Sequence, residues 1–145
     1  MKYLVLLHLL GAIIWLGGYI HAAVNLVPKA AKSKDPSLLS NFEANFHKLG
    51  YAALLLQLVT GIMLAFHYNP EFSNWFNMKM SINHVIITKL LLLVILVILA
   101  VYGKVKIFKN LTEEKIGAAS RNIIFITIIS LLLMFFGLSV RLPFF

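Results

Sequence analysis

The chain has 145 residues, of which 61% are hydrophobic and 12% are charged, and its formal net charge is +8. A mean hydropathy of +0.90 is far outside the range of soluble globular domains. The composition therefore excludes an ordinary soluble enzyme and indicates an integral membrane protein. There is no cysteine, which excludes disulfides, thiolate metal ligands and thiol redox chemistry.

Four apolar stretches are long enough for a helix to cross a bilayer, which takes about 20 residues. They predict helices at about 3–24, 49–67, 85–103 and 122–140 of a single transmembrane domain, residues 1–145. The predicted fold class is all-α, an integral membrane four-helix bundle.

The first predicted helix contains the segment "HLLGAIIWLGGYIH", His8 to His21. At about 100° per residue, His8, Gly11, Trp15 and Gly18 fall on one stripe of this helix. The glycines let a neighbouring helix approach closely. His8 and Trp15 place polar groups in an apolar span, which makes them candidate functional residues. His8 and His21 point about 140° apart around the helix, so we expect them to have different roles.

The chain continues through "SKDPS", a predicted helix start at Asp35-Pro36-Ser37 that leads into the second span. Polar residues that share a face within a span are predicted to line the bundle interior. They are Gln57, Thr60 and His67 in the second helix, and Thr127, Ser130 and Arg141 in the fourth.

Basic residues are divided unequally between the two sides of the predicted bundle. One side holds Lys29, Lys32, Lys34, Lys48, Lys104, Lys106, Lys109, Lys115 and Arg121, and the other holds Lys2, Lys79, Lys89 and Arg141. The positive-inside rule places the richer side in the cytoplasm, with both termini and the 68–84 connection extracytoplasmic. Lipid phosphates of the bilayer are sufficient partners for the net charge, so no nucleic-acid partner is expected.

Histidines gather near both ends of the predicted helices, and two methionines lie beside the outer group. Thioether sulfur favours Cu(I), and imidazole suits both copper states. The sequence therefore predicts a copper site. Its candidate ligands are His8, His67, Met78, Met80 and His84 on the extracytoplasmic side, with His21 and His47 near the cytoplasmic side.

Lys89 lies inside the third predicted helix, and no acidic residue in any predicted span can pair with it. The propionates of a haem would supply the missing negative charge, so a b-type haem is the alternative cofactor. The candidate haem-binding residues are His8, His67, His84, Lys89, Arg141 and Trp15. On this alternative the protein is a haem-dependent membrane oxidoreductase that acts in electron transfer or porphyrinogen oxidation. A scaffold without a bound metal is a third alternative, and assembly as a homo-oligomer is left open.

Three stretches resemble the CopD copper-resistance family of bacterial membrane proteins. They are "HLLGAIIWLGG", "FHKLGYAALLLQLVTGIMLAF" with its Thr60-Gly61 step, and "INHVIITKLLLLVILVILAVYGKVK", in which Lys89 matches the recurring lysine of the family. The resemblance implies the four-helix core domain of that family. It also implies a multi-pass protein of the bacterial inner (cytoplasmic) membrane that works in copper uptake or resistance.

The first and third stretches are also similar to the four-helix membrane protoporphyrinogen oxidases, which bind b-type haem. That family has a Pro-Arg-Leu-Phe-Val-Tyr-His run after its first helix, where this chain has "YIHAAVNLVPKA". Copper and haem therefore remain alternative predictions.

Overall fold

The computed structural model describes residues 1–140 and 142. Its α-helices are α1 (Lys2–His21), α2 (Val27–Ser33), α3 (Ser37–Tyr68), α4 (Ser81–Tyr102) and α5 (Ile116–Ser139). No strand occurs within the described residues. The predicted all-α class is therefore confirmed.

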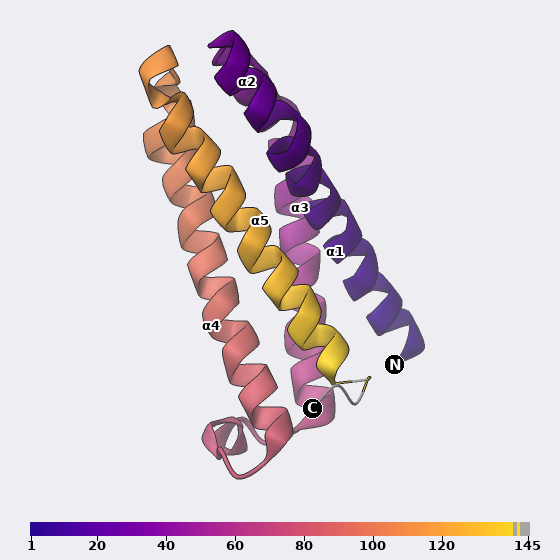
Figure 1. Ribbon diagram of the computed structural model, residues 1–145. Coiled ribbons are helices and arrows are strands. Elements are labelled where there is room, and N and C mark those ends of the chain that lie inside the picture. Colours follow the sequence, from indigo (N-terminus) through magenta and orange to yellow (C-terminus); the bar gives the residue numbers. More distant parts are fainter. Residues whose placement is uncertain (141, 143–145) are drawn as a thin grey trace.

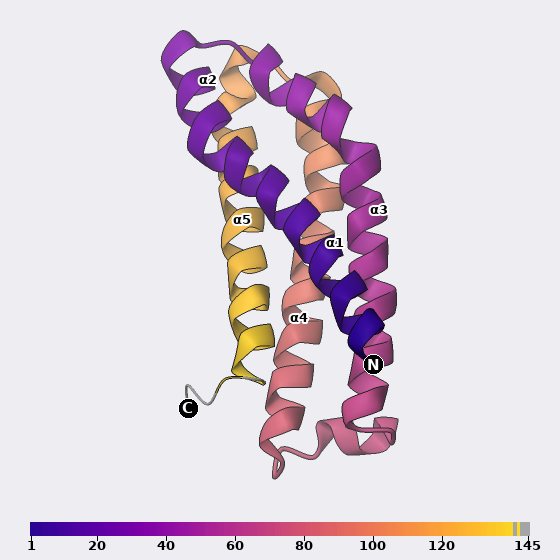
Figure 2. The ribbon, with the colours of Figure 1, turned by 90° about the vertical axis from the view of Figure 1, so that its right-hand side faces the viewer.

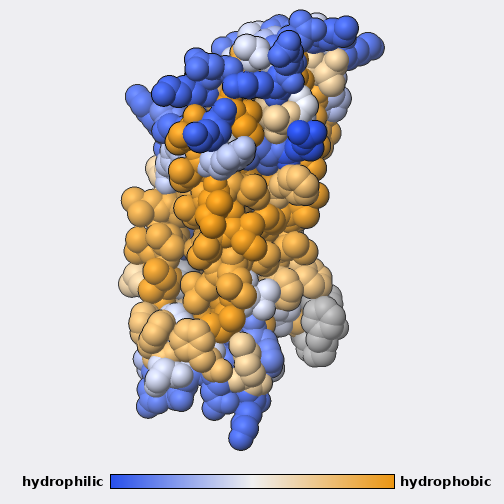
Figure 3. Space-filling view, turned by 90° about the vertical axis from the view of Figure 1, so that its left-hand side faces the viewer, coloured by the Kyte–Doolittle hydropathy of each residue, from blue (hydrophilic) through white to orange (hydrophobic). Residues whose placement is uncertain are grey.

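Short π-helical and 3-10 turns join these helices into four long rods. The rods span Lys2–Ser33, Ser37–Tyr68, Ser81–Asn110 and Glu113–Ser139, and each is long and apolar enough to cross a membrane. Figure 3 shows an apolar band between two hydrophilic ends. The rods extend beyond the predicted spans because charged segments remain helical where the apolar stretch ends.

The four rods are arranged in the order α3, α1, α5, α4. α1 packs on α3, α4 packs on α5, and α1 also contacts α5, whereas α3 and α4 make little direct contact (Figures 1 and 2). α1 begins and α5 ends beside the connection 69–80, and we call this end the connection end. The opposite end carries α2 and residues 103–115, and we call it the basic end.

The first rod stays helical through Pro28, which has no N–H and would clash with a carbonyl one turn earlier in a regular α-helix. A π-helical turn at Ala22–Leu26 widens the helix just before it. Lys34 adopts φ 55°, a left-handed conformation that ends the helix.

The predicted helix start at Asp35-Pro36-Ser37 is confirmed, since α3 begins at Ser37. An oxygen of the Asp35 carboxylate accepts hydrogen bonds from the Ser37 hydroxyl at 2.6 Å and from the Ser37 N–H at 2.9 Å. These bonds favour the charged carboxylate, so they hold the pKa of Asp35 below its usual value.

The stripe predicted on the first helix faces α3. Gly11 and Trp15 are buried, and a methyl group on Gly11 would lie 3.1 Å from the carbonyl oxygen of Ala53. A methyl group on Gly18 would overlap the ring of Phe46 in α3. The glycines therefore allow the close approach of α1 and α3 that the sequence predicts.

Asn122 joins α5 to α4 near the basic end. Its side-chain amide donates a hydrogen bond of 2.9 Å to the carbonyl oxygen of Leu99. Gly103 leaves room for this contact, because a Cβ there would lie 2.6 Å from Asn122 Oδ1. The same glycine begins the π-helical turn Gly103–Ile107 that extends the α4 rod.

Candidate functional site

The connection 69–80 is a hydrogen-bonded structure organised by Asn83, a residue of the first turn of α4 with 0% of its surface exposed. Its side-chain amide donates to the carbonyl oxygens of Asn74 and Asn77, both at 2.7 Å. Its Oδ1 accepts from Asn69 Nδ2 at 2.8 Å. Trp75, which is also buried, donates from Nε1 to the carbonyl oxygen of Asn69 at 2.8 Å. These hydrogen bonds therefore hold the backbone of the connection in one conformation.

His84 follows Asn83 and forms a hydrogen bond with the same connection. Its Nε2 lies 2.7 Å from the carbonyl oxygen of Met78. Because a carbonyl can only accept, Nε2 carries the proton, and Nδ1 of the neutral ring keeps its lone pair. The side chains of Met78 and Met80 are 48% and 50% exposed. The structure therefore brings one predicted imidazole ligand to the segment that carries both predicted thioethers.

His67 lies in the last turn of α3 and is exposed. Its ring contacts the ring of Tyr68, with centroids 5.9 Å apart. The prediction that His67 lines the interior with Gln57 and Thr60 is therefore wrong. His67 lies two turns beyond Thr60, which is the residue of α3 that contacts His8 of α1.

His8 lies half-buried between α1 and α3. Its Nδ1 is 2.8 Å from Thr60 Oγ1, and that hydroxyl donates its own proton to the carbonyl oxygen of Leu56 at 2.5 Å. Thr60 must therefore accept from His8 Nδ1–H, which leaves the lone pair on Nε2 of the neutral ring. The side chain of Gln57 donates to the backbone carbonyl oxygen of His8. The ring packs against Gly61, where a Cβ would lie 3.2 Å from His8 Cε1.

Lys89 extends from α4 toward the same region and is half-buried. Its ammonium lies against Gly137 of α5, where a Cβ would be 3.3 Å from Nζ. It is within electrostatic range of the His8 ring, and no acidic side chain of residues 1–140 forms an ion pair with it. Within the described residues, the bundle therefore holds a half-buried ammonium without an acidic partner. Arg141, its predicted companion, lies outside the described residues.

Two further interhelical hydrogen bonds follow the bundle axis toward the basic end. The indole Nε1 of Trp15 donates to Ser130 Oγ at 3.0 Å. Thr127 Oγ1 shares its one proton between the carbonyl oxygen of Ile123 in its own helix, at 2.8 Å, and that of Tyr19 in α1, at 3.2 Å. Thr127 and Ser130 are both buried. The prediction that these two residues line the interior is confirmed.

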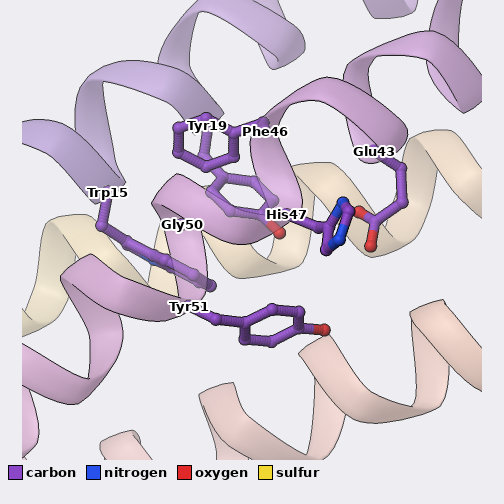
Figure 4. A pocket seen from close by; sticks show the side chains of 7 residues that line it. All are labelled: Trp15, Tyr19, Glu43, Phe46, His47, Gly50 and Tyr51. Atoms are coloured by element: carbon purple, nitrogen blue, oxygen red, sulfur yellow. The ribbon is translucent and has the colours of Figure 1, made fainter.

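The two histidines predicted near the cytoplasmic side have different surroundings. His21 is exposed and its Nδ1 accepts from Asn25 Nδ2 at 3.1 Å. His47 donates from Nδ1 to the carbonyl oxygen of Ala44 at 2.8 Å, so Nε2 of the neutral ring keeps its lone pair. Figure 4 shows the small pocket that His47 lines together with Trp15, Tyr19, Glu43, Phe46, Gly50 and Tyr51.

Within residues 1–140 and 142, no group of three or more His, Cys, Asp or Glu side chains is placed to hold a metal ion. The reason is that the histidine side chains leave their helices in different directions and do not converge. His8 turns inward to Thr60, His67 turns to the surface, and His84 turns to the connection. A copper site at the connection end therefore needs the thioether groups of Met78 and Met80.

Asn83 and Glu43 are among the residues of these sites that were not predicted from the sequence. Asn83 is one of several asparagines around the connection, and its spacing does not reveal which carbonyl groups it binds. Glu43 precedes His47 by one helical turn in an amphipathic run. That i, i+4 carboxylate–imidazole spacing is the signal that could have identified it.

No protein-family model matches the chain, and comparison with curated proteins and with solved structures gives no match. The fold and the site define the class of protein by themselves. It is an all-helical protein with four helices able to cross a membrane and with polar side chains bonded between them.

Proposed function

We propose that the protein is a copper-binding protein of the bacterial inner membrane that works in copper uptake or resistance. The observation that carries the proposal is the hydrogen bond between His84 Nε2 and the carbonyl oxygen of Met78, 2.7 Å long. Histidine ligands of metals commonly donate their second ring N–H to such a carbonyl, which fixes the ring and its tautomer. The bond leaves a lone pair on Nδ1 of His84, and Met78 and Met80 of the connection are exposed.

The proposed ligands of Cu(I) are Met78, Met80 and His84. Soft thioether and imidazole ligands suit this ion. His67, exposed on the last turn of α3 at the same end of the bundle, is the candidate fourth ligand. The ion is the cargo of the protein in this proposal, so an exposed and incompletely buried site is suitable for loading and release.

Lys89 argues against placing a second copper ion at His8. Its ammonium is within electrostatic range of the His8 ring, and a fixed positive charge repels a cation. We therefore confine the copper site to the connection end and make no proposal for a copper path through the bundle.

Copper binding is tested with purified protein in lipid nanodiscs, titrated with Cu(I) under anaerobic conditions against a coloured chelator. We expect Met78→Leu, Met80→Leu and His84→Ala each to weaken binding by about tenfold or more. Met63→Leu is the matched control, because Met63 is an exposed methionine of α3 outside the connection. Failure of the wild type to bind Cu(I), or equal weakening by the control, would overturn the proposal.

Binding of haem b is the second candidate, and a separate observation favours it. His8 offers an Nε2 lone pair, and Lys89, whose ammonium forms no ion pair within the described residues, is within electrostatic range of the His8 ring. His8 would ligate the haem iron and Lys89 would pair with a propionate. A bound haem would supply one-electron redox chemistry.

Visible absorption spectra before and after dithionite distinguish the two candidates. A Soret band that shifts on reduction and is lost in His8→Ala, but not in Met80→Leu, would support haem. A colourless protein that binds Cu(I) with the ligand dependence above would support copper.

A further inference from the structure

The small pocket at the basic end contains polar groups that have no hydrogen-bond partner among the described residues (Figure 4). Glu43 of α3 is half-buried there. Within the described residues, its carboxylate forms no hydrogen bond and no ion pair, and the hydroxyl groups of Tyr19 and Tyr51 form no hydrogen bond. His47 Nε2 keeps a lone pair because Nδ1 donates to the backbone. The pocket therefore offers a negative charge and several hydrogen-bond acceptors.

The walls of the pocket are aromatic. Trp15 and Tyr19 pack with ring centroids 4.7 Å apart, and Tyr19 meets the ring of Phe46 edge-on at 5.8 Å. Aromatic faces attract cations, most strongly where water is excluded. A carboxylate that lines the same pocket as these rings, as Glu43 does, is suited to an ammonium group.

The pocket is small, with room for a group about the size of one water molecule. Phe46 restricts it, because this ring lies against both Gly18 and Gly50. A primary ammonium has that size and carries three N–H donors. A quaternary ammonium is larger and has no donor, so the geometry selects the primary amine.

Lys104 already brings an ammonium to the rim. Its Nζ lies 4.8 Å from the centre of the Tyr51 ring, and its charge interacts with that of Glu43. Lys104 is exposed, so it is free to contact an anion. A ligand with an ammonium group and a nearby anionic group would therefore be bound at both positions.

The place of the pocket in the fold indicates the source of such a ligand. It lies at the basic end, where the apolar stretch of α3 gives way to exposed Lys48. Residues of α1 and α3 line it, and Lys104 follows α4. Leu49 and Leu55 of α3, on either side of Gly50 and Tyr51 in the chain, are exposed, so an apolar surface for lipid chains lies close to the pocket. We propose that this pocket binds the primary ammonium of an ethanolamine phospholipid headgroup, with Glu43 as its counter-charge and Lys104 on the phosphate.

The test uses the full chain, reconstituted in vesicles of phosphatidylethanolamine and phosphatidylglycerol and then gently delipidated in detergent. Native mass spectrometry counts the lipids that remain bound. We expect one phosphatidylethanolamine to be retained in preference to phosphatidylglycerol, and Glu43→Gln to reduce that retention by at least about tenfold. Glu113→Gln, an exposed acid at the same end outside the pocket, is the matched control and leaves retention unchanged.

Two further arms identify the ligand chemistry. Phosphatidylcholine replaces phosphatidylethanolamine in one arm, and we expect it not to be retained. In the other arm ethylamine competes with the lipid, and we expect displacement only at concentrations far above those of the lipid. Retention of phosphatidylcholine, or displacement by ethylamine at equal concentration, would overturn the lipid assignment.

A second pair of variants keeps the proposal testable if Glu43→Gln does not fold, which circular dichroism would reveal. Lys104→Ala changes an exposed side chain and should reduce retention several-fold, whereas the neighbouring Lys106→Ala should not. Equal retention by wild type and Lys104→Ala, or equal losses from both lysine variants, would overturn the proposed phosphate contact. This experiment does not depend on whether the protein binds copper.

Discussion

Gly18 of α1 lies directly against the ring of Phe46 in α3, so closely that a methyl group on this glycine would overlap the ring. The neighbouring Gly17 has nothing within 4 Å of the position that a Cβ would take. Gly18 is therefore needed for the packing of α1 on α3, and Gly17 is not.

We expect Gly18→Ala to lower the free energy of unfolding by about 1–3 kcal/mol, because overpacking displaces the aromatic ring or the helix. Gly17→Ala should change it by less than about 0.5 kcal/mol. Unfolding in mixed detergent micelles, followed by circular dichroism, measures both. Adding Phe46→Leu to Gly18→Ala should restore part of the loss. Equal stability of the two alanine variants would contradict the packing that we describe.

The hydrogen bond between His8 and Thr60 gives the second prediction. Thr60→Val removes the acceptor for His8 Nδ1–H, and we expect a loss of about 0.5–2 kcal/mol in the free energy of unfolding. Thr60→Ser keeps the hydroxyl and should retain most of the stability. Nitrogen-15 NMR of labelled histidine should show the Nδ1–H tautomer in the wild type. An Nε2–H tautomer there would show that the bond has the opposite direction.

Asn83 gives the third prediction, since its side chain holds together the beginning, middle and end of the connection. Asn83→Ala removes three hydrogen bonds. We expect amide hydrogen exchange over residues 69–80 to accelerate by about tenfold or more, with little change in α3 and α5. Ser81→Ala, an exposed position in the same helical turn, is the control. If exchange in the connection is unchanged in Asn83→Ala, the connection is ordered by other contacts.

The contact between Gly103 and Asn122 gives the fourth prediction. Gly103→Ala would place a Cβ 2.6 Å from Asn122 Oδ1 and should disrupt the bond to the Leu99 carbonyl. We expect a loss of about 1–3 kcal/mol in the free energy of unfolding. Gly117→Ala is the control, because nothing lies within 4 Å of its Cβ position. A comparable loss of stability in Gly117→Ala would show that replacing any helical glycine has this effect, and that the contact between Gly103 and Asn122 is not its cause.

Much of the fold could be predicted because it depends on local properties of the sequence. Apolar length identifies the four helices, and the 3.6-residue period places His8, Trp15 and Gly18 on one face. Rotation about a long helix is harder to predict near its end. His67 shares the face of Thr60 by spacing, yet it is exposed, because it lies two turns beyond Thr60, whose partner His8 is already near the beginning of α1.

The candidate site was predictable in its residue types and not in its contacts. The sequence indicates histidines and methionines at one end of the bundle, and the structure joins His84 to the Met78 backbone. Glu43 attracts little notice in the sequence, since an acid in an amphipathic run is usually solvated. Its importance follows from the pocket that it lines together with aromatic residues of α1 and α3.

By itself the sequence determined the all-helical class, the four apolar rods and the helix start at Ser37, because these depend on composition and on neighbours within a few residues. The tertiary structure alone decided which ring nitrogen of each bonded histidine is free, which glycine meets an aromatic ring, and which acid lies in a pocket. Those features depend on how helices distant in the sequence are rotated against each other. Packing between side chains sets that rotation, and no single helix encodes it.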